Sequence, residues 1–234
     1  MNILDQIKQE LPWLGDNELY DLTRGKPSPN QLLLSQKLIE SISQPFEMDG
    51  VDLRNYGTPE GINSARALGS IILNTEEDKT LALDNSSLTL MHQILACSYF
   101  LGFSSSKLTP ESKFICLVPG YDRHFKLLEN FGIEMISVPF LENGPDIEKI
   151  KEYISKDNSI HGIVCVPRHS NPTGHTFTDE QVDHIFKAIQ PNKENFMIIW
   201  DNAYACHDLK ETIKQSSASS IAHTNGVENN LFIL

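Results

Sequence analysis

The sequence predicts an α/β protein with a mostly parallel sheet, and three observations support this. From about residue 80, short apolar runs of strand length recur along the chain, and amphipathic stretches follow most of them. Apolar residues make up 40% and charged residues 21%, which is typical of a packed globular domain. The alternation of short apolar runs with amphipathic stretches is the pattern of repeated βαβ units with helices on both faces of the sheet. Strands are expected at residues 80–83, 114–118, 134–139, 162–166, 196–200 and 231–234, and helices at 88–101, 125–131, 147–154 and 180–189.

The first part of the chain predicts helices outside this alternation. Ser28-Pro29 is a helix-start signal, and the apolar spacing that follows predicts a helix to about Ser43. A second amphipathic helix is expected from Pro59 to Asn74. We therefore expect an N-terminal segment over residues 1–50 and a sheet domain over residues 51–234. The chain ends in an apolar, strand-like run at Leu231 to Leu234, so this sheet domain is expected to be incomplete or to need a partner.

Composition excludes several classes of function. The 19 basic and 31 acidic residues give a net charge of −12 with no basic cluster, which argues against nucleic acid or an anionic membrane as a partner. The chain has no apolar run of about 18 residues and no signal-peptide pattern at its start, so a cytoplasmic protein is expected. The four cysteines are far apart and are expected to be reduced, mostly core residues rather than metal ligands.

Polar residues gather where the predicted strands end. Ligands of open parallel sheets bind at the carboxyl ends of the strands. The groups that follow the first, second, fourth and fifth predicted strands are Ser86-Ser87, Tyr121 to His124, Asn171 to Gly174, and Asp201 to Tyr204. Each group also has a simpler interpretation: a serine helix cap, a plain turn, tyrosines packed on the core, or a satisfied histidine. Asp201 is the exception, because a carboxylate leaving an apolar strand needs a positive or donor partner.

Taken in order, these residues resemble the class I/II aminotransferases, which are pyridoxal-phosphate enzymes of fold type I. The resemblance covers about residues 20–234 and is closest to an aspartate-aminotransferase-like subgroup. It is carried by Asn171-Pro172-Thr173-Gly174, Asp201-Asn202-Ala203-Tyr204 and Tyr56-Gly57-Thr58-Pro59-Glu60-Gly61. It implies a three-layer α/β/α large domain, with residues 1–50 as a helical segment of the small domain.

The resemblance also implies a role for each site residue. Asp201 would pair with the protonated ring nitrogen of pyridoxal phosphate, with His124 behind it as an orienting partner. Tyr121 would stack on the ring, and Asn171 and Tyr204 would donate hydrogen bonds to the ring oxygen. The phosphate would be held by Ser86, Ser87 and, from a neighbouring subunit, Tyr56. Gly25 and Asn171 would lie near the substrate, and Asn171-Pro172 is a candidate cis peptide.

The chain departs from the family pattern in one respect. The Schiff-base lysine of the family lies one strand and a few residues beyond the D-x-A-Y motif, and here the sequence ends at Leu234. Lys210 and Lys214 precede that strand and do not match. We therefore expect no catalytic lysine within these residues, no metal site, and a chain that is truncated relative to the family.

Several functions stay open at this point. The first is an aminotransferase that acts on an amino acid, with aspartate as a candidate, and a 2-oxo acid, as a homodimer. The second is a non-catalytic remnant or binding protein that uses the same fold. Lyases and decarboxylases share this cofactor bed, so the reaction type rests on family analogy. A dinucleotide-binding protein is disfavoured, because Asp84-Asn85-Ser86-Ser87 replaces the glycine-rich motif after the first strand.

Overall fold

The computed structural model describes residues 3–11, 26–41, 47–48, 50–103, 107–208 and 217–234. The chain divides into two compact units, residues 1–47 and 48–234. Among the described residues, no helix combines the length and the apolar character needed to cross a lipid bilayer.

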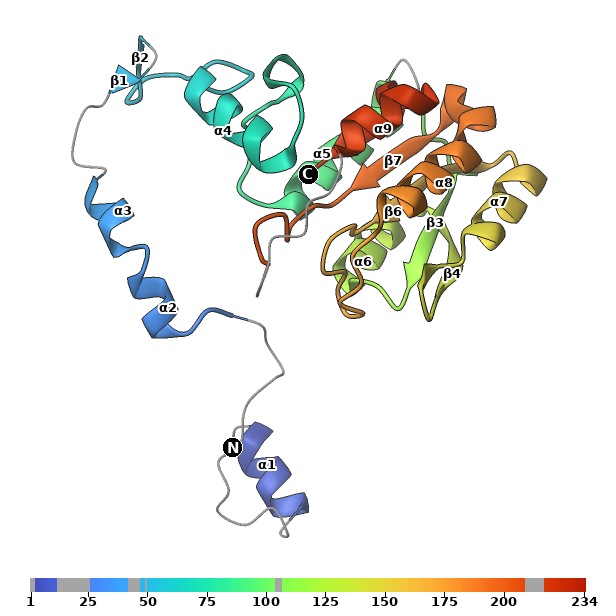
Figure 1. The fold of residues 1–234 in the computed structure, drawn as a ribbon, viewed down its shortest axis with the longest axis horizontal. Helices are drawn as coiled ribbons and strands as arrows, with labels where there is room; N and C mark the ends of the chain where they lie inside the picture. Colours follow the sequence, from blue (N-terminus) through green and yellow to red (C-terminus); the bar gives the residue numbers. More distant parts are fainter. Residues whose placement is uncertain (1–2, 12–25, 42–46, 49, 104–106, 209–216) are drawn as a thin grey trace. The chain divides into compact units, whose positions relative to one another are not determined.

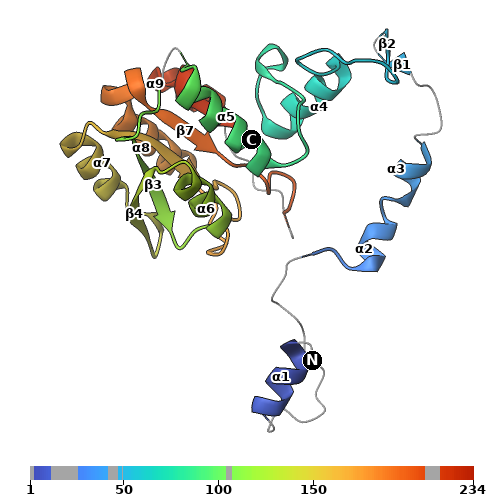
Figure 2. The ribbon, with the colours of Figure 1, turned by 180° about the vertical axis from the view of Figure 1, so that it is seen from behind.

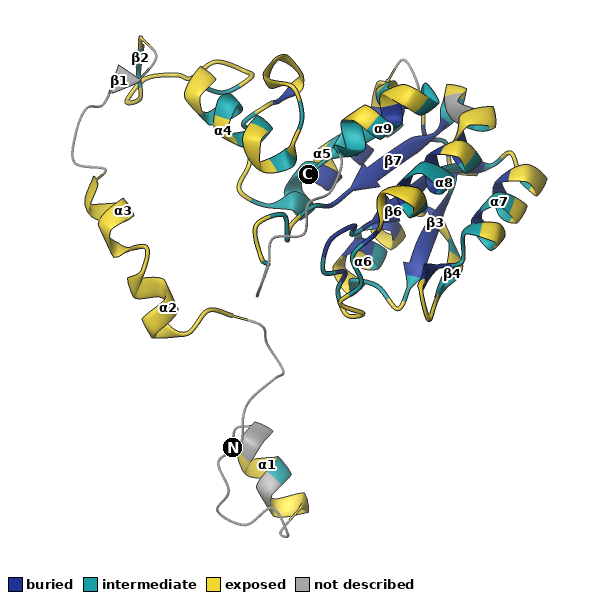
Figure 3. Cartoon of the chain, viewed as in Figure 1, coloured by how far each residue is buried: buried dark blue, intermediate teal, exposed yellow. Residues whose placement is uncertain are grey.

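The described residues of the first unit form three short helices. They are α1 (Ile3–Glu10), α2 (Pro29–Leu33) and α3 (Gln36–Glu40). Ser28 begins α2 through a capping box with Gln31, as the helix-start signal predicts. The single helix expected from Ser28 to Ser43 is wrong, because it breaks into α2 and α3. Neither piece buries a residue, and short helices without a packed apolar face are marginal in water (Figure 3).

The second unit holds the sheet. Its elements, in chain order (Figure 1), are β1 (Glu47–Met48, which begins in the first unit), β2 (Val51–Asp52), α4 (Asn63–Leu73), η3 (Glu77–Lys79), α5 (Ser87–Phe100), β3 (Lys113–Val118), α6 (Asp122–Asn130), β4 (Glu134–Leu141), β5 (Gly144–Pro145), α7 (Ile147–Lys156), β6 (Ile160–Cys165), α8 (Asp179–Ile189), η4 (Gln190–Asn195), β7 (Met197–Trp200), α9 (Ala218–Asn225), η5 (Glu228–Asn230) and β8 (Leu231–Ile233).

The six-stranded sheet has the order β5-β4-β3-β6-β7-β8. Every neighbouring pair is parallel except β4 with β5, which is antiparallel. The predicted α/β class and mostly parallel sheet are therefore confirmed. Five of the six predicted strands and all four helices predicted after residue 80 form with end shifts of a few residues, whereas α9 was not predicted.

The predicted strand at residues 80–83 does not form. These residues are extended, and Ala82 donates its backbone N–H to Glu60 O at 2.9 Å, but they belong to neither sheet among the described residues. Leu81 and Leu83 are 58% and 54% exposed. A strand needs a ladder partner, and none lies beside this segment in the described part of the chain.

The predicted helix at residues 59–74 is shorter than expected and begins at Asn63. Gly61 has a left-handed φ of +84°, which a right-handed helix cannot contain. A Cβ at this position would also clash with Ala82. The turn before α4 is therefore fixed by a glycine that packs on the extended segment at residues 80–83.

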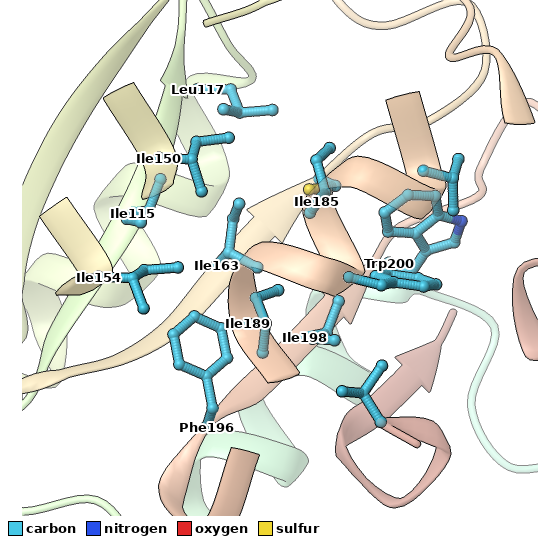
Figure 4. Packing of buried hydrophobic residues seen from close by; sticks show 14 of the residues in the cluster. Ile115, Leu117, Ile150, Ile154, Ile163, Ile185, Ile189, Phe196, Ile198 and Trp200 are labelled. Atoms are coloured by element: carbon cyan, nitrogen blue, oxygen red, sulfur yellow. The ribbon is translucent and has the colours of Figure 1, made fainter. Parts of the chain in front are cut away.

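Helices cover both faces of the sheet, which makes three layers. One apolar cluster joins the sheet to α7, α8 and α9 through residues such as Ile150, Ile185 and Ala222 (Figures 1 and 4). The other joins it to α5 and α6 through Met91 and Leu128, on the face seen from behind in Figure 2. Successive side chains of a buried strand point to opposite faces, so one strand serves both clusters.

Strong caps fix where the covering helices begin. Thr178 and Gln181 form a reciprocal capping box at the start of α8. Asp146 accepts a hydrogen bond from the backbone of Lys149 at the start of α7, at 3.0 Å. The α8 start follows the loop after β6, so the Thr178 cap also holds the end of the loop that carries Asn171.

Candidate functional site

The polar residues predicted from the sequence come from loops at one edge of the sheet. The strands β3, β6 and β7 run parallel, so their carboxyl ends lie on the same side. Tyr121 follows β3, Asn171 follows β6, and Asp201 and Tyr204 follow β7. The carboxyl edge of a parallel sheet is where ligands bind in open α/β folds.

Asp201 is the residue on which the hydrogen bonds at this edge converge. Its residue is 3% exposed, and its backbone N–H donates to Cys165 O at 2.9 Å, which continues the ladder from β7 to β6. Its Oδ2 accepts a hydrogen bond from Ser87 Oγ at 3.2 Å and lies 2.7 Å from His124 Nε2. Its Oδ1 is buried and has no hydrogen-bond partner among the described residues. A buried carboxylate oxygen without a donor is costly, so this atom calls for one.

His124 reaches Asp201 from the first turn of α6. The turn is set by Tyr121, which precedes the helix and accepts the backbone N–H of His124 at 3.1 Å. The two rings pack edge to face, with centroids 5.1 Å apart. His124 is 3% exposed, whereas Tyr121 is half-buried. The predicted contact of His124 with Asp201 is therefore present, and Tyr121 lies directly beside it.

The serines at the start of α5 behave differently from a simple cap. Ser86 occupies the cap position, but its side chain makes no capping hydrogen bond. Ser87 donates to Asp201 instead, across 114 residues of sequence. The first backbone N–H groups of this 14-residue helix therefore lack a side-chain cap from Ser86. Such a helix start can accept an anion.

Asn171 lies in a tightly closed loop after β6. The Asn171-Pro172 peptide, a candidate cis bond from the sequence, is cis, and Val118-Pro119 is also cis. Backbone bonds close the loop: Ser170 N–H donates to His175 O at 2.8 Å, and Gly174 N–H donates to Ser170 O at 2.6 Å. Gly174 has a φ of +73°, which a turn of this kind requires of a glycine.

A partly buried ion cluster links the loop after β6 to the turn after β7. Arg168 Nε donates to Asp208 Oδ1 at 3.2 Å, and Arg168 Nη2 pairs with Asp208 Oδ2. His169 Nε2 lies 3.0 Å from the same Asp208 Oδ1. This cluster has no signal in the sequence, because no local pattern shows which cation an aspartate 40 residues away will contact.

Tyr204 lies in the turn between Asp201 and Asp208. Its ring packs edge to face on His207, with centroids 5.6 Å apart, and its carbonyl accepts the backbone N–H of His207 at 3.1 Å. Tyr204 is half-buried. Among the contacts of the described residues, no hydrogen bond joins Asn171 or Tyr204 to Asp201. These two residues share the sheet edge with Asp201 but are not part of its hydrogen-bonded group.

Other residues named from the sequence fall outside this group. Gly25, Lys210 and Lys214 lie outside the described residues. Tyr56 is 96% exposed and is not among the residues that contact Asp201. Among the described residues, no group of three or more His, Cys, Asp or Glu side chains is placed to hold a metal ion.

The four cysteines are free, but the expectation that most lie in the core is wrong. Cys116 and Cys165 are buried in the sheet, whereas Cys97 and Cys206 are exposed. Burial raises the pKa of the Cys116 thiol to about 12 and raises the pKa of Cys165 as well. Cys97 lies in an apolar helix, α5, on a side that the sheet does not cover.

A cavity of about 200 Å³ lies beside this edge but does not contain Asp201. Its lining includes Arg168, Trp200 and Asn202, together with residues of α8 and α9. Trp200 belongs to the apolar cluster on the α7, α8 and α9 face, whereas His124, the partner of Asp201, comes from α6 on the other face. We take the Asp201 group as the candidate site, because Ser87 and His124 converge on one oxygen of a buried carboxylate whose other oxygen, Oδ1, has no hydrogen-bond partner among the described residues.

Comparison with known proteins gives a consistent result. Residues 15–234 match the family described as aspartate amino-transferase. An aspartate aminotransferase of Corynebacterium glutamicum is 40% identical over 215 residues, which covers 88% of this chain and 49% of that protein. The chain therefore spans about half the length of this curated relative.

Solved structures show the same similarity. A crystal structure of an aspartate transaminase from Corynebacterium glutamicum matches with a TM-score of 0.84 and 36% identity, over 98% of this chain and 55% of that one. The α-aminoadipate aminotransferase of Thermus thermophilus, at 17% identity, has the same fold, with a TM-score of 0.70 over 90% of this chain and 50% of that one.

Proposed function

The chain belongs to the aspartate aminotransferase family, and from that premise we propose that it supplies the pyridoxal-phosphate bed of an enzyme that moves an amino group between an amino acid and a 2-oxo acid. Its relatives are about twice as long, so the proposal concerns the activity of a whole protein that contains this sequence. The fold and the carboxylate at the end of β7 support it.

The observation that carries the proposal is the unsatisfied Oδ1 of Asp201. The second oxygen of this carboxylate is held by Ser87 and His124, so its position is fixed while Oδ1 lacks a donor among the described residues. A cationic N–H of a pyridine ring is a donor of the right charge and shape. Because Oδ1 is also enclosed, a neighbouring side chain has to move aside when the ring enters.

When bound, pyridoxal phosphate acts as an electron sink, which is deepest while its ring nitrogen carries a proton. In our proposal Asp201 holds that proton by charge pairing, and His124 orients the carboxylate. Tyr121 supplies a ring face for stacking beside them. Asn171 and Tyr204 donate hydrogen bonds to the ring oxygen from the two neighbouring loops.

The phosphate group is assigned to the start of α5. Ser86 and the first backbone N–H groups of the helix are our preferred donors, since the Ser86 side chain makes no capping bond. Ser87 has a competing partner in Asp201, so it can serve the phosphate only after its hydroxyl turns away. A second contribution is proposed from Tyr56 of another copy of the chain, which fits its 96% exposure.

The finer points follow from the family. We propose that the whole protein is a homodimer and that residues 1–50 contribute to its small domain. A dicarboxylic amino acid such as aspartate is the proposed substrate, supported by the function named for the Corynebacterium relative. Asn171 and Gly25 are its proposed neighbours. For the 234 residues taken alone we expect non-covalent cofactor binding.

Cofactor binding tests the proposal directly. Pyridoxal phosphate and pyridoxamine phosphate, the second of which needs no lysine, are titrated into the purified chain and followed by absorbance and fluorescence. We expect saturable binding, weakened roughly 10- to 100-fold in Asp201→Asn by loss of one charge-assisted hydrogen bond. Asp183→Asn, which removes an aspartate paired with Lys187 on α8, is the control. Wild-type chain without saturable binding contradicts the proposal.

A further inference from the structure

The ion cluster of Arg168, His169 and Asp208 is not part of the proposed cofactor contacts. Arg168 is 8% exposed, and the side chain of Asp208 is 13% exposed. Removing such charges from water is costly before the pairing is counted, so a largely buried pair is weak evidence of added stability. We therefore consider which segments of the chain this ion cluster holds in position.

The cluster joins the two segments that carry Asn171 and Tyr204. Arg168 and His169 stand two or three residues before Asn171, and Asp208 stands four residues after Tyr204. Asp208 contacts both side chains. Its Oδ1 lies within hydrogen-bond distance of Arg168 Nε and of His169 Nε2, and its Oδ2 pairs with Arg168 Nη2. The loop after β6 and the turn after β7 are therefore held together by side-chain contacts, in addition to the pairing of the two strands.

The backbone of the β6 loop is shaped to make this contact. His169 has a left-handed φ of +46°, which is uncommon for a residue with a side chain. Its backbone N–H donates to Thr176 Oγ1 at 3.1 Å, and Phe177 N–H donates to Pro167 O at 2.8 Å, across the base of the loop. A conformation of this kind persists when the surrounding contacts over-determine it.

We infer that Arg168, His169 and Asp208 are positioning residues that set Tyr204 and Asn171 at one spacing, so that both can donate to the same ring oxygen of the cofactor. The inference rests on the proposed function. Two donors that converge on one oxygen need their loops held to within a fraction of an ångström, which hydrogen-bonded supporting residues provide. The guanidinium group of Arg168 can hold the loops in this way, because its two contacts with the Asp208 carboxylate fix the direction of the pair as well as its distance.

The test measures the cofactor's own ring oxygen. The pKa of the ring hydroxyl of bound pyridoxamine phosphate is followed by absorbance against pH in the wild-type chain and in Asp208→Asn. Donors that converge on the oxygen favour its ionised form, so we expect the variant to shift this pKa upward and to weaken binding about 3- to 30-fold. Arg168→Lys keeps the charge without the fork and is expected to show an intermediate shift.

A double substitution separates positioning from general stability. If Asp208 acts through Tyr204, the pKa change caused by Asp208→Asn shrinks when Tyr204→Phe is already present. Asp157→Asn is the matched control, since Asp157 also binds a lysine and a serine but lies near the amino end of β3. An unchanged ring pKa in Asp208→Asn, or an equal shift in the Tyr204→Phe background, overturns the inference.

The cofactor-free chain provides a separate readout. Amide hydrogen exchange in residues 168–176 and 202–207 is expected to speed up together in Asp208→Asn and to stay unchanged in Asp157→Asn. Wild-type chain that binds no pyridoxamine phosphate defeats the proposed function, and with it the role toward the cofactor. Normal binding with unchanged exchange in both segments defeats the positioning role alone.

Discussion

His124 Nε2 and Asp201 Oδ2 lie 2.7 Å apart, although 77 residues separate them in the sequence. Both side chains are almost fully enclosed, at 3% and 4% exposure. The contact joins the start of α6 to the end of β7 across the edge of the sheet. It fixes one oxygen of the carboxylate and leaves the other in place for a ligand, which is the basis of the proposed site.

Replacing His124 with alanine should destabilise the chain. The substitution removes a partner from a buried carboxylate and leaves a space beside Tyr121. Loss of one such buried hydrogen bond costs about 1–3 kcal/mol in the free energy of unfolding, measured by denaturant titration. His223→Ala serves as the control, because the His223 side chain is 79% exposed. Equal effects of the two substitutions would refute the structural importance of the contact.

Gly162→Ala should also destabilise the chain. Gly162 lies opposite Phe114 in the β3–β6 register, and a Cβ at this position would overlap the phenyl ring, which is fully buried. Such overpacking typically costs about 1–3 kcal/mol. Gly57→Ala is the matched control, since its Cβ would meet no atom within 4 Å. Thermal melts of the two variants should separate clearly, and a stable Gly162→Ala chain would contradict the packing described here.

Part of the chain's acid sensitivity should come from Asp157. Hydrogen bonds from the Ser159 side chain and from Lys113 lower the pKa of Asp157 from 3.8 to about 2. Because the folded pKa is the lower one, its stabilising contribution is full above the ordinary pKa and is lost as the pH falls towards the folded value. Asp157→Asn should therefore show a flatter loss of stability between pH 3.8 and about 2. Parallel unfolding curves for the two chains would argue against this.

The cysteines should divide into two classes towards a thiol reagent. Cys97 and Cys206 are exposed and should react in the folded chain, whereas burial raises the thiol pKa of Cys116 and Cys165 and blocks access to them. We expect two thiols to be labelled quickly and two only after denaturation. Mass spectrometry of labelled peptides identifies them. Fast labelling of Cys116 in the native state would show that the sheet is not packed as described.

The sequence predicts the fold correctly where a local apolar pattern corresponds to a buried strand. The buried strands β3, β6 and β7 were located by their apolar runs, and the polar residues that end them could then be assigned to one edge. Asp201 is a strong candidate because a carboxylate at the end of a buried strand needs a positive or hydrogen-bond-donating partner. Family motifs in the same order added the cofactor.

Long-range contacts and unpartnered segments could not be predicted. Thr80 to Leu83 has strand composition, but a strand requires a neighbour, which local sequence does not report. The Arg168 and Asp208 pair has no periodic signal, and Ser87 was assigned to a phosphate while its hydroxyl meets Asp201. The break between α2 and α3 likewise has no local signal, and neither helix buries a residue in the described part of the chain.

If Asp201 keeps a bound pyridine ring cationic, the protonation state of the ring nitrogen reports on it. The most direct measurement is ¹⁵N NMR of ring-labelled pyridoxamine phosphate bound to the chain, followed from neutral to mildly alkaline pH. We expect the nitrogen to stay protonated in the wild-type chain and to lose its proton in Asp201→Asn. A nitrogen that is unprotonated in the wild-type complex, or equally protonated in both, would contradict the assignment of this site.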